Sequence, residues 1–122
     1  MSMRLRPNVL LEPKVCYELW VGKNGTRESI YTIPHILAQQ GIVNKTTGKP
    51  VTPQGVWRAA SLYILEHPNE AKSDTVSILS QHGEVLDEMV WGVEMIAKAR
   101  QLLSRGKYRI FLAKYPEYKQ YE

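Results

Sequence analysis

Glycine and proline divide residues 33–56 into two segments suited to helices, with a loop between them. The first segment ends at Gly41, a residue type that commonly terminates helices. The loop 44–51 contains both glycine and proline, which excludes regular helix there. Thr52 and Pro53 then supply the second segment with a capping side chain and a proline in its first turn. This order predicts a helix-turn-helix unit.

Length and composition favour a globular protein organised in two parts. The chain has 122 residues, of which 43% are hydrophobic and 23% are charged. We expect a helix-turn-helix unit over residues 1–67 and a helical C-terminal part over 68–122, which either completes the core or forms oligomers. No apolar run approaches the roughly 18–20 residues that a membrane span needs. A single cysteine and an N-terminus without signal-peptide features lead us to expect a cytoplasmic protein.

The two parts differ in charge. Residues 1–67 hold eight Lys/Arg against four Glu, whereas residues 68–122 hold eight basic against eight acidic side chains. Clustered positive charge is typical of proteins that bind phosphate backbones. The alternative is a solvated basic surface that serves solubility.

The N-terminal region leaves two structures open. Residues 1–11 look like an extended arm, whose Arg4 and Arg6 would suit an adjacent minor groove of DNA. Residues 14–21 suit a short helix before Gly22. Strand-forming residues there, followed by an Asn-Gly turn signal, also allow a short hairpin with residues 29–33.

The second helix of the unit has an apolar and a polar face. At 100° per residue the apolar residues share one side and are expected to be core, namely Val56, Ala59, Ala60, Tyr63 and Ile64. Glutamine and arginine on the other side are residue types that read base edges in a major groove, although they also suit an ordinary wet surface. Lysines and threonines of the loop suit phosphate contacts. The predicted DNA-binding residues are Arg27, Lys45, Thr46, Thr47, Lys49, Thr52, Gln54, Trp57, Arg58 and Ser61.

The same segment resembles the DNA-binding "recombinase" region that follows the catalytic domain in large serine recombinases. The positions that fall on the family pattern in register are Ile33, Leu37, Gly41-Ile42, Gly48-Lys49, Thr52 and Val56. Pro34 and Val51 depart from it, and the resemblance covers about a quarter of the chain. Only 32 residues precede the segment. The resemblance therefore implies a DNA-binding module of a phage or mobile element, and not strand exchange.

In the second part, a polar linker over 69–73 and a short helix over 75–82 are expected before a long helix over 84–105 that ends at Gly106. The long helix carries two apolar stripes, and a surface helix usually needs only one. The first stripe, expected to be core, contains Val85, Met89, Val93, Ile96, Ala99 and Leu103. The second stripe contains Trp91, Met95 and Leu102.

Two structures could bury the second stripe, and the sequence does not decide between them. The first is the tail 108–118, folded back on the helix, and the second is a partner subunit, since helix-turn-helix proteins commonly bind DNA as dimers. The repeated tyrosines of the tail also suit stacking on single-stranded bases.

No enzyme signature is found. The three histidines are scattered, no pair of ligands has zinc spacing, and Cys16 is expected to be a buried structural cysteine. We therefore predict a mainly α-helical protein of helix-turn-helix or winged-helix type, with no cofactor. It would bind double-stranded DNA as a small transcription regulator or recruitment subunit. The alternative is a protein-binding adaptor or assembly component that uses the Trp91/Met95/Leu102 surface.

Overall fold

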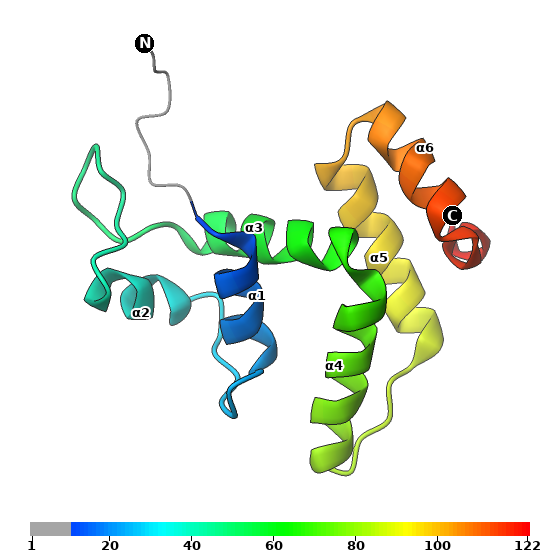
Figure 1. Ribbon diagram of the computed structural model, residues 1–122, viewed down its shortest axis with the longest axis horizontal. Coiled ribbons are helices and arrows are strands. Elements are labelled where there is room, and N and C mark those ends of the chain that lie inside the picture. The colour runs from blue at the N-terminus through cyan, green and yellow to red at the C-terminus, as the bar shows by residue number, and fades with distance from the viewer. Residues whose placement is uncertain (1–10) are drawn as a thin grey trace. The chain divides into compact units, whose positions relative to one another are not determined.

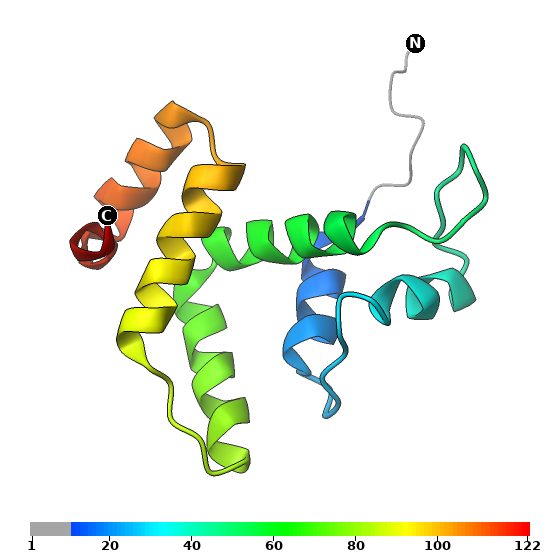
Figure 2. The ribbon, with the colours of Figure 1, turned by 180° about the vertical axis from the view of Figure 1, so that it is seen from behind.

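The structure, a computed structural model, describes residues 11–122 and divides into two compact units, Met1–Tyr63 and Ile64–Glu122. Six α-helices and one 3-10 helix make up all regular secondary structure of the described residues. The course of the chain through them can be followed in Figures 1 and 2. The predicted mainly α-helical class is confirmed. The predicted arm, with Arg4 and Arg6, lies outside the described residues.

The alternative of an N-terminal hairpin is wrong, because residues 13–21 are helical. Helix α1, Pro13–Val21, begins with a proline in its first turn and ends at Gly22, whose φ of 82° is left-handed. The Gly22 N–H donates to the Glu18 carbonyl at 3.1 Å, which closes the helix. The sequence after α1 therefore continues as a loop, which Glu28 fastens to α1 by donating its N–H to the Leu19 carbonyl at 3.0 Å.

The first unit contains two further helices. Helix α2 covers Ile33–Gln39, and helix α3 covers Pro53–Glu66, so that α3 continues past the boundary between the units. The Thr52 hydroxyl accepts a hydrogen bond from the Gly55 N–H at 3.0 Å, which is the predicted cap of α3. The connection over residues 40–52 has 13 residues, compared with three or four in a minimal helix-turn-helix.

Apolar residues of all three helices form the core of the first unit. The Tyr17 and Tyr63 rings stack with their centroids 4.6 Å apart, which ties α1 to α3. The buried apolar residues of this unit are Cys16, Tyr17, Ile33, Leu37, Val51, Val56, Ala59, Ala60 and Tyr63.

The second unit differs from the predicted order of linker, short helix and long helix. Helix α4 covers Pro68–Gln81, so residues 69–73 are helical. Helix α5 covers Glu88–Leu102 and starts late because Asp87 caps it, accepting from the N–H groups of Met89 at 2.9 Å and Val90 at 3.2 Å.

Helix α6, Arg105–Lys114, begins where the long helix was expected to end. The Ser104 hydroxyl caps it by accepting from the Lys107 N–H at 3.3 Å, and Gly106 lies inside it. A 3-10 helix, η1, covers Pro116–Tyr121. Figures 1 and 2 show α6 running back along α5, with η1 at its end.

The core of the second unit lies between α5, α6 and η1. Helix α5 buries Gly92, Met95, Ile96 and Ala99, and the tail contributes the buried Phe111, Leu112 and Tyr118. The Phe111 and Tyr118 rings stack with their centroids 5.6 Å apart. None of the helices in residues 11–122 has the length and apolar character needed to cross a membrane.

Candidate functional site

The loop before α3 is held in shape by its own hydrogen bonds. The Asn44 side-chain oxygen accepts from the N–H groups of Thr46 at 2.9 Å and Thr47 at 3.3 Å. The Asn44 N–H donates to the Lys49 carbonyl at 2.9 Å, and Gly48 adopts a left-handed φ of 72°. Figure 1 shows the loop as the excursion between α2 and α3. This frame gives the loop a defined shape while its side chains remain exposed.

Four predicted site residues lie on this loop, and all are exposed: Lys45, Thr46, Thr47 and Lys49. The Thr47 hydroxyl accepts from the Lys49 N–H at 3.2 Å, and its own hydrogen remains available for donation. Sequence reasoning missed the role of Asn44. The signal for it was an asparagine within a loop, because asparagine side chains commonly accept a hydrogen bond from the backbone two residues on.

The first two turns of α3 expose the two side chains with the most suitable chemistry. Gln54 and Arg58 are exposed, and Trp57 is half-buried. Ser61, expected on the same exposed side, is fully buried, and its hydroxyl has no hydrogen-bond partner among residues 11–122. The reason is that α3 is exposed on one side only near its start, while residues 59–61 and 63–65 are all buried. Ser61 is therefore not available to a ligand.

Two further predicted residues have local roles. Thr52 is exposed and caps α3. Arg27 is exposed in the loop after α1, where its Cγ lies 2.6 Å from the place a Cβ on Gly22 would occupy. Arg27 therefore lies in a different loop from the two lysines.

The distribution of charge around α3 is one-sided. Residues 29–65 contain Lys45, Lys49 and Arg58 and no aspartate or glutamate. The first turn of α3 likewise has no acidic residue, so the positive end of the helix dipole is not offset there. The exposed cations and hydroxyls of the loop, and the exposed start of α3, are each suited to anions. We refer to these groups together as the α3 surface: the exposed residues of 45–49, with Gln54 and Arg58.

Comparisons with protein-family models, curated proteins and solved structures find no match to this chain.

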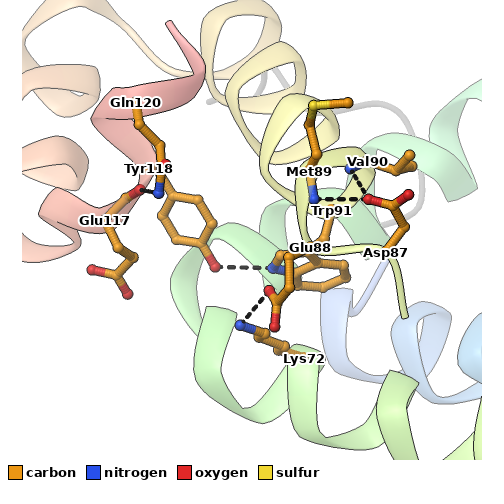
Figure 3. Close-up of polar contacts among 9 residues, drawn as sticks. All are labelled: Lys72, Asp87, Glu88, Met89, Val90, Trp91, Glu117, Tyr118 and Gln120. Atoms are coloured by element: carbon orange, nitrogen blue, oxygen red, sulfur yellow. Dashed lines mark hydrogen bonds and ion pairs between the residues drawn. The ribbon is translucent and has the colours of Figure 1, made fainter. Parts of the chain in front are cut away.

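The second predicted surface, Trp91/Met95/Leu102, is largely buried within the chain, and the tail contacts it at Trp91. Met95 is only 1% exposed, and Trp91 and Leu102 are half-buried. The Trp91 indole N–H donates to the Tyr118 hydroxyl at 3.0 Å, and Figure 3 shows the two side chains pointing toward one another. Burial raises the pKa of Tyr118, and the bond from Trp91 acts in the opposite direction. These residues therefore belong to the core of the second unit.

The first stripe, expected to be core, is only partly buried. Ile96 and Ala99 are buried as expected, and Leu103 is half-buried, but Val85 is 91%, Met89 63% and Val93 51% exposed. Val85 is outside α5 because the helix begins only at Glu88. Residues 11–122 thus leave an apolar face of α5 exposed. This face lies opposite the Trp91/Met95/Leu102 stripe, which the sequence analysis expected to be the partner-binding surface.

Other features of the described residues offer little chemistry. No group of three or more His, Cys, Asp or Glu among residues 11–122 is placed to hold a metal ion. Burial raises the pKa of the Cys16 thiol to about 11, so at neutral pH it is a poor nucleophile. A cavity of about 220 Å³ in the first unit is lined by Leu11, Glu12, Val15, Cys16, Leu37, Gln40 and Ile42.

Proposed function

We propose that this protein binds double-stranded DNA through the α3 surface, with the first turns of α3 in the major groove. The observation that carries the proposal is the exposure of Lys45, Lys49 and Arg58 within 37 residues that contain no carboxylate. A surface with exposed cations binds a phosphate backbone favourably, because binding releases the counterions that are condensed on the DNA. A neighbouring carboxylate would oppose that gain, and residues 29–65 contain none.

The proposed roles follow from where each side chain lies. Lys45 and Lys49 project from the hydrogen-bonded loop and would contact phosphates on either side of the groove. Gln54 and Arg58 are one helical turn apart on the exposed side of α3 and would meet base edges, glutamine pairing with adenine and arginine with guanine. The positive end of the α3 dipole favours a phosphate near the start of the helix.

The biological setting we propose is that of a small regulator or a recruitment subunit of a phage or mobile element. It is supported by the resemblance of residues 33–56 to the DNA-binding region of large serine recombinases. The long connection between α2 and α3 is compatible with that setting, since a Gly-Lys-containing loop belongs to the family pattern.

The test is fluorescence anisotropy of the full chain with duplex DNA of mixed sequence, titrated from low to moderate salt. We expect affinity to fall steeply with salt. Lys49→Ala with Arg58→Ala should reduce the slope of log K against log [salt] by about 2, since each phosphate that a cation neutralises contributes roughly 0.9 to that slope. The matched control is Lys107→Ala with Arg109→Ala, which removes the same charge from exposed positions of α6.

This control distinguishes binding through the α3 surface from binding that depends only on the net charge of the protein. If the two double variants lose affinity and slope equally, binding depends on overall charge and the α3 surface is not the interface. Absence of binding even at low salt would overturn the proposal altogether.

A further inference from the structure

The exposed apolar face of α5 is a continuous stripe. Met89 and Val90 are 63% and 49% exposed, Val93 is 51% exposed, and Ala97 is exposed one turn further along. At 100° per residue, Met89, Val90, Val93 and Ala97 fall within about 100° of one another, away from the face that buries Met95 and Ala99. Such a contiguous stripe on a helix is a feature of association surfaces, whereas single exposed apolar residues are common.

The charges at the two ends of this stripe have opposite sign. Residues 84–94, at the start of α5, contain four acidic side chains and no basic one, and residues 98–105, where α5 ends and α6 begins, contain three basic side chains and no acidic one. The apparent neutrality of the C-terminal part therefore conceals a separation of charge along α5. One of the acidic residues, Glu88, is already paired with Lys72 of α4 at 2.7 Å, as Figure 3 shows, and Glu84 and Asp87 remain exposed beside it.

We infer that the Met89/Val90/Val93/Ala97 face of α5 binds the same face of a second copy of this chain, with the two helices antiparallel. A twofold axis across the stripe brings the acidic end of each helix to the basic end of the other, so the attraction occurs twice. A parallel pairing would place like charges together at both ends. The stripe and the charges thus point to one arrangement.

Other occupants fit these charges less well. DNA and an anionic membrane would both be repelled by the acidic end of the stripe while being attracted by its basic end. A second copy is complementary to both ends. Helix α5 is about 22 Å long, so the contact is small, and we expect a weak, reversible dimer with Kd on the order of micromolar or higher.

The first experiment is sedimentation velocity of the full chain without DNA, over a wide range of concentration. We expect a monomer–dimer equilibrium that Val93→Glu, and independently Val90→Glu, weakens by tenfold or more, about 1.4 kcal/mol. The matched control is Val76→Glu, the same substitution at a 46% exposed valine of α4, and it should leave the equilibrium unchanged. Circular dichroism establishes that each variant keeps its helices. A monomer at every concentration, or equal effects of the three substitutions, would overturn the inference.

The salt dependence tests the antiparallel arrangement separately. Sodium chloride should weaken the wild-type dimer, because opposite charges meet at its ends. Arg100→Glu lowers the positive charge of the basic end, so its dimer should be weaker than the wild-type dimer and less sensitive to salt. If salt strengthens the wild-type dimer instead, the antiparallel arrangement is wrong. Because no DNA is present, these results do not depend on the proposed function.

Discussion

Gly92 offers a stringent test of how the tail packs on α5. It lies inside the helix, buried, and a Cβ added to it would lie 2.6 Å from Tyr121 Cζ and closer still to Cε2 and Cδ2 of that ring. Alanine is favoured over glycine within a helix by about 0.8–1.0 kcal/mol. Gly92→Ala would therefore stabilise the protein if the ring were not there. With the ring in place, the ring has to move away from α5.

The size of the penalty follows from what Tyr121 buries. Full burial of a large apolar side chain contributes about 1.5–3 kcal/mol, and a half-buried ring contributes roughly half of that, about 1–1.5 kcal/mol. We therefore expect Gly92→Ala to be neutral or to destabilise the wild type by up to about 0.5 kcal/mol, and to stabilise Tyr121→Ala by about 1 kcal/mol. The coupling between the two positions is then about 1–1.5 kcal/mol, larger than the additivity error of about 0.3–0.5.

The assay is chemical denaturation of the four proteins of this cycle, followed by far-UV circular dichroism. The change in the free energy of unfolding caused by Gly92→Ala is compared between the wild type and Tyr121→Ala. Effects of the substitution that do not involve the ring are then common to both and cancel. If Gly92→Ala stabilises the wild type by the full value expected from helix propensity, the ring does not pack where the structure has it. The packing described for η1 on α5 would then be refuted.

Three further predictions concern single side chains. Tyr118→Phe removes the acceptor of the Trp91 N–H and should lower the free energy of unfolding by about 1 kcal/mol, and an unchanged denaturation midpoint would show that this bond adds nothing. Asp87→Ala should cost about 1 kcal/mol by removing the cap of α5, whereas Asp87→Asn should retain most of it in the same assay. Burial raises the pKa of Cys16 from its ordinary value of 9.0 to about 11, so the unfolded thiol ionises first and stability should fall between about pH 9 and 11. The fall should be smaller in Cys16→Ser, and equal pH profiles for the two proteins would contradict this origin.

Local signals in the sequence were sufficient to place the start of α3 and the glycine that ends α1. Thr52 and Pro53 mark the start of α3, and the capping bond from the Gly55 N–H accounts for it. Gly22 ends α1 in a left-handed conformation that most other residues would adopt only with strain. These features depend on residues within one turn of each other, so no knowledge of the fold is needed to find them.

The choice between the two stripes of α5 depended on distant residues. Both stripes are apolar at helical spacing, and periodicity alone does not say which one the tail covers. The tail covers the side that contains Gly92, where the missing side chain admits the Tyr121 ring, and where Trp91 meets the Tyr118 hydroxyl. The later start of α5 at Glu88 has a local signal, in contrast, because Asp87 is the only residue of 84–88 whose side chain is of a preferred capping type. The burial of Ser61 has no local signal, because serine suits an exposed position of α3 equally well.

The DNA-binding surface and the dimer surface that we propose lie in different units. Each can therefore be mutated separately, and the effect of dimerisation on DNA affinity can be measured. If two copies pair through α5, DNA with two sites is bound with avidity, since the second contact forms at high effective concentration. Val93→Glu should then weaken apparent affinity for such DNA while leaving affinity for a single-site oligonucleotide unchanged. Lys49→Ala with Arg58→Ala should weaken binding to both DNAs and leave the dimer intact. If Val93→Glu weakens binding to the single-site DNA as well, the substitution disturbs the α3 surface itself, and the two surfaces are not independent.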